Sequence, residues 1–103
     1  MADTNAPTGS IKLNGALPAG GGVDEFAVTK NGAAVVYTAD QDTVNRRELY
    51  IVNLASPGVT TRLNTPLTVN RDVLDFAVSP DGTKVVYRAD QDNDEIVNLY
   101  ALE

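Results

Sequence analysis

The sequence FAVTKNGAAVVYTADQD at residues 26–42 recurs fifty positions later as FAVSPDGTKVVYRADQD at residues 76–92, with 11 of 17 residues identical. The two copies align without a gap well beyond this stretch. The matching pairs outside it are Leu13-Asn14 and Leu63-Asn64, Leu17 and Leu67, Val23 and Val73, and Leu49-Tyr50 and Leu99-Tyr100. Repeats of about fifty residues with several short apolar runs are typical of units that bury their apolar faces by stacking on neighbours. The chain therefore consists of two copies of one such unit.

The apolar residues alternate with a period of two, which predicts β-strands and no amphipathic helix. Each unit contains a hairpin whose tight turn, Lys30-Asn31-Gly32 or Ser79-Pro80-Asp81-Gly82, ends in a glycine that can take positive φ. The expected strands are Ser10–Leu17, Phe26–Val28, Val35–Tyr37 and Glu48–Leu54, followed by Thr61–Asn64, Phe76–Val78, Val85–Tyr87 and Asn98–Leu102. We divide the chain into a flexible leader at residues 1–9, a first repeat at 10–59 and a second repeat at 60–103.

The net charge, the short apolar runs and the missing residue types exclude several classes of ligand and of catalytic mechanism. The net charge of −6 argues against a nucleic-acid or anionic-membrane surface, because both attract clustered Lys and Arg. The longest apolar run, at residues 33–37, is far shorter than the roughly 20 residues that a membrane-spanning helix needs, so no membrane insertion is expected. The chain has no cysteine and no histidine, so it offers no thiolate and no Ser-His-Asp triad. We therefore expect a protein that is not an enzyme.

The second copy resembles the TolB-like, WD-like β-propeller repeat, F-x-x-SPDG-x-x-[VI]-x-[YF] followed by an LY-containing strand. The residues that carry the resemblance are Phe76, Ser79-Pro80-Asp81-Gly82, Val85, Tyr87 and Leu99-Tyr100. The first copy departs from the motif at Thr29-Lys30-Asn31-Gly32, which keeps the glycine and lacks the proline. The resemblance implies an all-β fold with two blades of four antiparallel strands, ordered a to d outward from a central axis. It also favours a periplasmic or extracellular bacterial protein, although the sequence itself fixes no compartment.

In that scheme the strands run d, a, b, c, d, a, b, c, so the chain opens with an unattached d and closes with a c that lacks its d. Two blades cannot curl round to meet each other. The strand Ser10–Leu17 is therefore expected to complete the blade ending at Leu102 of another copy, head to tail. A six-bladed homotrimer is the favoured ring and an eight-bladed homotetramer the second. The residues expected at this contact are Ile11, Leu13, Leu17, Leu99, Tyr100 and Leu102.

The candidate ligand face consists of the acidic loops that follow the second hairpin strand of each unit, with Asp40 and Asp42 in the first and Asp90 and Asp92 in the second. In the second copy Asp90, Asp92 and Asp94 alternate as oxygen ligands of Ca²⁺ do. Glu95 and Ala101 stand where an EF-hand needs glycine and glutamate, so this is not that motif. The alternative is that these carboxylates accept hydrogen bonds from nearby backbone.

These observations leave several functions open. The leading hypothesis is a non-catalytic scaffold that binds copies of itself, with no required cofactor and a protein or carbohydrate as a further ligand. A calcium-dependent binding module is the second, and a glycosidase that uses a carboxylate pair is the third. A chain that is a passive fragment of a longer propeller is the remaining alternative.

Overall fold

The computed structural model describes residues 10–29, 32–43, 46–64, 67, 71–82, 84–93 and 96–102. Within these ranges every regular element is a strand, and the strands form two antiparallel sheets, which confirms the all-β prediction. The first sheet holds β1 (Val23–Val28), β2 (Ala34–Ala39), β3 (Glu48–Asn53) and β4 (Thr60–Arg62), and the second holds β5 (Val73–Val78), β6 (Val85–Asn93) and β7 (Ile96–Leu102). Within the same ranges no helix is long and apolar enough to cross a membrane.

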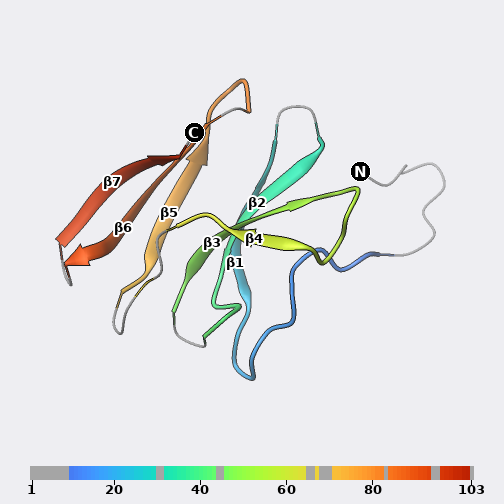
Figure 1. Ribbon diagram of the computed structural model, residues 1–103, viewed down its shortest axis with the longest axis horizontal. Coiled ribbons are helices and arrows are strands. Elements are labelled where there is room, and N and C mark those ends of the chain that lie inside the picture. The colour runs from blue at the N-terminus through green and yellow to red at the C-terminus, as the bar shows by residue number, and fades with distance from the viewer. Residues whose placement is uncertain are drawn as a thin grey trace.

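Each sheet is a meander in which strands adjacent in sequence are adjacent in space, and the two sheets lie side by side (Figure 1). The registers of the two hairpins are equivalent, since Phe26 pairs with Tyr37 and Phe76 pairs with Tyr87. Gly32 and Gly82 close these hairpins with φ of 72° and 75°, as the turn chemistry predicts. The sequence repeat is therefore a repeat of structure.

The core between the sheets consists of one face of each. Val36 and Leu49 from the first sheet are fully buried against Val73 and Tyr87 from the second. We call these surfaces the first-sheet inner face and the second-sheet inner face. β5, the first strand of the second sheet, lies against β1 and β2, the first two strands of the first sheet. A single sheet encloses no core, so the contact between the four-stranded and the three-stranded sheet supplies the hydrophobic core of the chain.

The leading segment, residues 10–22, lies against the opposite face of the first sheet (Figure 1). Leu13 packs there on the cluster that contains Tyr37 and Tyr50, and the Leu13 carbonyl accepts a hydrogen bond of 3.0 Å from the Gly58 N–H. Residues 10–17, predicted as a strand, have no strand assignment in the single chain. The physical reason is that the segment contacts a sheet face, whereas a strand needs the backbone ladder of a neighbouring edge.

The second hairpin of the second unit is longer than predicted. Residues 89–92 were expected to form a loop, but β6 continues to Asn93, whose backbone pairs with that of Ile96. A register irregularity between Ala89 and Asn93 absorbs the change. In the first unit β2 ends at Ala39 and a loop follows, with the Arg46 N–H donating to the Thr43 carbonyl at 3.1 Å. The two copies therefore differ most in the acidic segments.

Candidate functional site

Two of the predicted acidic residues accept hydrogen bonds from backbone amides. The Asp40 carboxylate accepts one of 2.6 Å from the Gly22 N–H, and Asp90 accepts one of 2.9 Å from the Asp72 N–H. In each unit this bond ties the segment before the first strand to the end of the second hairpin strand. Charge-assisted hydrogen bonds of this kind are stronger than neutral ones. A structural role for Asp40 and Asp90 follows from these contacts.

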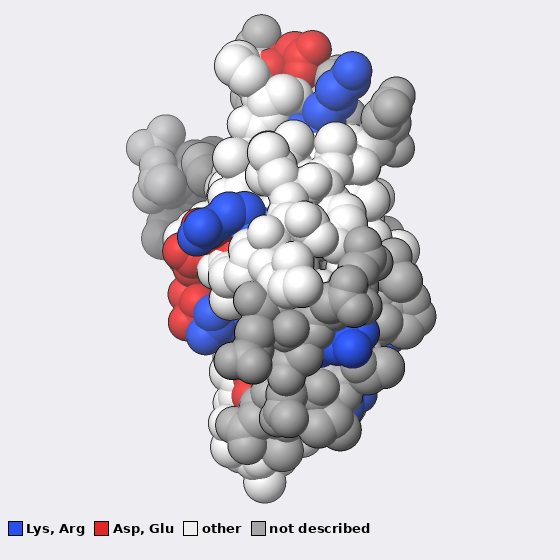
Figure 2. Space-filling view, turned by 90° about the vertical axis from the view of Figure 1, so that its left-hand side faces the viewer, with Lys and Arg blue, Asp and Glu red and all other residues white. Residues whose placement is uncertain are grey.

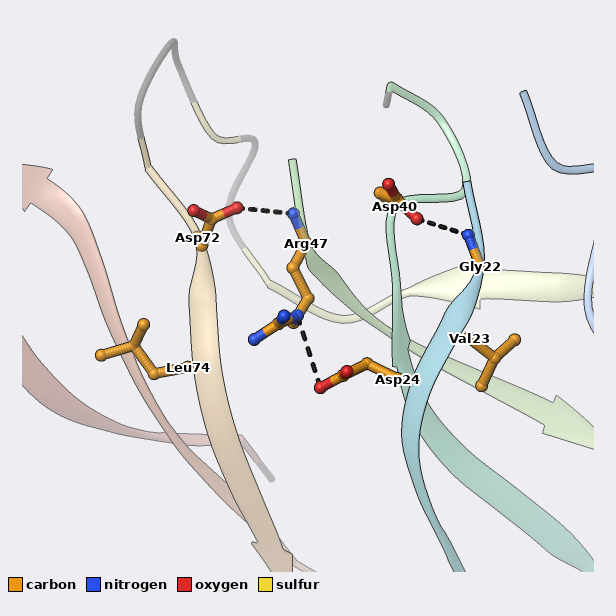
Figure 3. Close-up of a pocket in the computed structure, with 7 residues that line it drawn as sticks. All are labelled: Gly22, Val23, Asp24, Asp40, Arg47, Asp72 and Leu74. Atoms are coloured by element: carbon orange, nitrogen blue, oxygen red, sulfur yellow. Dashed lines mark hydrogen bonds and ion pairs between the residues drawn. The ribbon is translucent and has the colours of Figure 1, made fainter. Parts of the chain in front are cut away.

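A pocket of about 470 Å³ lies beside these bonds at one end of the sheets. Figure 3 shows Arg47 between two carboxylates, Asp72 and Asp24. The Arg47 backbone N–H donates to Asp72 at 2.7 Å, and its Nε lies 3.5 Å from the nearer Asp24 oxygen. Both side chains of the ion pair are more than a third exposed, so the pair stabilises the fold little. The hydrogen bond to Asp72, in contrast, joins the first unit to the second.

The remaining acidic candidates do not converge on one point in the part of the chain that the structure describes. Asp42 forms an ion pair with Arg62, with 3.6 Å between Asp42 Oδ2 and Arg62 Nη1, while Asp40 is directed to Gly22. Asp94 and the side chain of Asp92 lie outside the described residues. Among the described residues, no group of three or more carboxylates is arranged to hold a metal ion. The calcium and ligand-face assignments stay predictions.

Replacing Asp40 with alanine should lower the free energy of unfolding by about 1–3 kcal/mol, because the Gly22 N–H loses a charged acceptor. Asp24→Ala is the matched control, since it removes an exposed ion pair with Arg47 worth about 0–1 kcal/mol. Urea unfolding followed by circular dichroism measures both. Equal losses for the two variants would show that the Asp40 bond is not a structural contact.

Gln41 is a contact residue that the sequence did not single out. Its side chain is only 8% exposed, and its Oε1 accepts hydrogen bonds from the Tyr37 hydroxyl at 2.6 Å and from the Gly15 N–H at 3.0 Å. Its Nε2 donates to the Thr60 hydroxyl at 2.9 Å. Gln41 therefore links the leading segment, β2 and β4. The available signal was its identity with Gln91 inside a polar segment, where side chains ordinarily vary freely between copies.

The two tyrosines of the first sheet, Tyr37 and Tyr50, stack with ring centroids 5.4 Å apart. Burial raises the pKa of Tyr37, and burial together with the negative charge of Glu48 raises the pKa of Tyr50 well above its ordinary value. An unfolded tyrosine ionises near pH 10, so unfolding releases protons above that pH. The stability that these tyrosines contribute is therefore complete below about pH 10 and is lost as the pH rises further.

An alkaline titration tests this. We expect the tyrosinate absorbance of Tyr37 and Tyr50 to appear only together with loss of the β-sheet circular dichroism signal. The Tyr50→Phe variant should retain more of its stability above pH 10 than the parent chain does. Ionisation of every tyrosine near pH 10 in a chain that stays folded would contradict the burial assigned here.

The clearest functional feature is a difference in exposure between residues that the repeat makes equivalent. Val36 and Leu49 are fully buried in the first sheet, whereas their equivalents in the second, Val86 and Leu99, are 38% and 71% exposed. Val86 and Leu99 lie on the side of the second sheet that faces away from the core, which we call the second-sheet outer face. Figure 2 views the molecule from the side on which β6 and β7 lie in Figure 1, and residues other than Lys, Arg, Asp and Glu make up much of the described surface there.

The first sheet shows the reverse asymmetry. Val73 is fully buried and Phe76 half-buried in the second unit, whereas Val23 and Phe26 are 43% and 70% exposed. Val23, Phe26 and Val28 line an apolar groove of about 470 Å³ between the first sheet and the leading segment. We call this surface the first-sheet outer face. Val23, Phe26, Val28 and Val86 were not predicted as contact residues from the sequence, although their equivalence to Val73, Phe76, Val78 and Val36 in the repeat marks them.

The residues that the sequence assigned to self-association fall into two groups. Ile11, Leu17 and Leu99 are exposed, and Leu13 is partly buried on the first sheet. Tyr100 and Leu102 instead pack inward, against the core between the sheets. Any part that Tyr100 and Leu102 take in a contact with another copy therefore comes from the backbone edge of β7.

Comparison with protein-family models, with curated proteins and with solved structures found no match to this chain. The features of the chain that indicate a function are the two outer faces and the internal repeat.

Proposed function

We propose that this chain is a non-catalytic scaffold that assembles head to tail with copies of itself into a closed β-propeller ring. The observation that supports it best is the difference in exposure between equivalent residues, of which Leu49 at 0% and Leu99 at 71% are the clearest pair. Each outer face is the repeat equivalent of an inner face that is buried within the chain. The two outer faces therefore suit each other as the two inner faces do.

The geometry of the proposed contact follows from the intrachain one. Within the chain, the first-sheet inner face packs on the second-sheet inner face. A shift of one repeat converts this pair into the second-sheet outer face of one copy on the first-sheet outer face of the next. In that contact Leu99 takes the place of Leu49, and Phe26 takes the place of Phe76. The contact is heterologous, so repeated application gives a ring if the rotation closes and a filament if it does not.

The energetics favour covering both faces. Burying a Val, Leu, Ile or Phe side chain stabilises by roughly 1.5–3 kcal/mol relative to leaving it in water. The large hydrophobic residues exposed on the described surface include Ile11, Val23, Phe26, Val28, Leu74, Val86, Ile96, Val97 and Leu99. Exposed apolar surface on this scale is a mark of interaction sites. Burial of half of these side chains is enough to offset several kcal/mol of association entropy.

The resemblance to TolB-like repeats supports a ring over a filament, with blades formed by β1–β4 and by β5–β7 completed by one further strand. Six blades from three chains is the favoured assembly, and eight blades from four chains is the second. The acidic segments that carry Asp40 and Asp90 then lie at one end of the ring. A protein or carbohydrate ligand at that end is a further part of the proposal.

Removal of residues 1–17 tests the scaffold function, because it deletes one wall of the groove on the first-sheet outer face. We expect the truncated chain to be monomeric by light scattering while it keeps its β-sheet circular dichroism signal. Removal of residues 1–9 alone is the matched control and should leave the oligomer intact. An unchanged oligomer after removal of residues 1–17 would refute head-to-tail assembly through this surface.

A further inference from the structure

We propose that residues 10–14 of one copy form the fourth strand of the second sheet of the neighbouring copy, in a register set by the repeat. The strand pairs with β7 so that Ser10 lies opposite Leu102, Ile11 opposite Ala101 and Lys12 opposite Tyr100. This inference rests on the head-to-tail assembly proposed above and adds the edge contact to the face contact.

The register comes from the edge of the first sheet, where β4 pairs antiparallel with β3. The paired residues there are Val52 and Thr60, Ile51 and Thr61, and Tyr50 and Arg62. Adding fifty to each β3 residue and subtracting fifty from each β4 residue gives the three pairs proposed. In the repeat, β3 is equivalent to β7, and β4 is equivalent to residues 10–12. The same shift of fifty residues relates the two hairpins, whose registers are equivalent.

The strand that receives residues 10–14 is β7, the outermost strand of the second sheet. Within the described residues, β7 pairs with β6 on one side and with no strand on the other. Unpaired edges present a row of backbone donors and acceptors that another strand can extend. The second sheet therefore has three strands where its sequence equivalent has four.

The side chains of residues 10–14 match those of the template strand. Ser10 stands for Thr60, Lys12 for Arg62, Leu13 for Leu63 and Asn14 for Asn64. In the first sheet the Gln41 amide donates to the Thr60 hydroxyl and accepts from the Tyr37 hydroxyl. Its equivalent Gln91 already accepts from the Tyr87 hydroxyl at 2.9 Å. In the assembly the Gln91 amide donates to the Ser10 hydroxyl of the neighbouring copy.

Asn14 supplies the most specific contact of the proposed strand. In the template the Leu49 N–H donates to the Asn64 side-chain oxygen at 2.7 Å, and the Leu63 N–H donates to the Leu49 carbonyl at 2.7 Å. The equivalent bonds run from the Leu99 N–H to Asn14 and from the Leu13 N–H to the Leu99 carbonyl. Leu99 thus contributes both its exposed side chain and its backbone to the contact between copies.

The leading segment is already held where the neighbouring sheet would dock. The Gly58 N–H donates to the Leu13 carbonyl at 3.0 Å, the Gly15 N–H donates to Gln41, and the Gly22 N–H donates to Asp40. Leu13 packs on the first-sheet outer face as its equivalent, Leu63, packs on the core between the sheets. A sheet that docks on the first-sheet outer face therefore meets residues 10–14 at its β7 edge.

Disulfide trapping tests the register directly, because the natural chain has no cysteine. The variants Ile11→Cys and Ala101→Cys are prepared separately, mixed under native conditions and oxidised. We expect a covalent dimer from the mixture and little from either variant alone, since the two cysteines meet only between copies. Ile11→Cys mixed with Val97→Cys is the slipped control. Residue 97 lies four residues along β7 from the position proposed to face residue 11, which is a distance of about 13 Å. A disulfide cannot span that distance.

The outcomes separate the register from the assembly. At least about tenfold more dimer with Ala101→Cys than with Val97→Cys supports the register, because a disulfide requires the two Cα atoms to lie within about 7 Å. An oligomeric native mass combined with equal or absent trapping at the two positions overturns the register and leaves the face contact standing. A monomeric native mass for the parent chain overturns both.

Discussion

Leu99→Asp should give a folded monomer of about 10.9 kDa in place of the proposed oligomer. Leu99 is 71% exposed in the single chain, so the substitution buries no charge there. In the proposed ring, the same position faces the apolar first-sheet outer face of the next copy. A carboxylate buried in that contact without a partner costs several kcal/mol, which exceeds what a single interface residue ordinarily contributes.

The matched control is Val59→Asp, which places the same charge at a residue that is 70% exposed in the connection between β3 and β4. Light scattering should give the parent mass for this variant. Phe26→Asp, on the opposite outer face, should give monomers as Leu99→Asp does. A mixture of Phe26→Asp and Leu99→Asp retains one intact pair of faces and should form dimers of about 22 kDa, twice 10.9 kDa. An oligomeric Leu99→Asp would mean that the second-sheet outer face is not the contact.

The second large effect concerns stability. Leu49→Ala should lower the free energy of unfolding by about 2–5 kcal/mol, because Leu49 is fully buried and its truncation leaves a cavity. The equivalent Leu99→Ala should cost the monomer less than about 0.5 kcal/mol, as exposed positions do. Urea unfolding of both substitutions in the monomeric Phe26→Asp background measures this difference.

In the proposed ring the two substitutions should become similar in effect, because that assembly would bury Leu99 as the chain buries Leu49. The comparison is made well above the concentration at which the oligomer dissociates. A Leu99→Ala chain that is as stable as the parent in the assembled state would contradict burial of this residue between copies. The pair of alanine variants therefore probes the proposed equivalence of the two contacts.

The local features of the fold were predictable from the sequence because they depend on local chemistry. Alternating apolar residues predicted the strands, and the glycines at positions 32 and 82 predicted the hairpin turns with positive φ. The extension of β6 to Asn93 was not predictable, since it depends on pairing with Ile96 across an irregular register. Residues 10–17, predicted as a strand, have no strand assignment, because the composition of a segment does not encode whether a strand edge lies beside it to pair with.

The candidate site was predictable only in part. The sequence named Ile11 and Leu99, which are exposed, but it also named Tyr100, whose side chain packs on the core. Alternation along a strand identifies two faces and does not say which one meets the other unit. Phe26 and Phe76 occupy equivalent positions of the two copies. Only the packing of the two sheets makes Phe26 exposed and Phe76 half-buried.

The solution mass of the unmodified chain, measured by light scattering after size exclusion at several concentrations, tests the central claim most directly. The proposed ring predicts about 33 kDa for three chains of 10.9 kDa, or about 44 kDa for four, with a mass that does not grow as concentration rises. A mass of 10.9 kDa at every concentration would contradict self-assembly and leave both outer faces without the partner proposed for them.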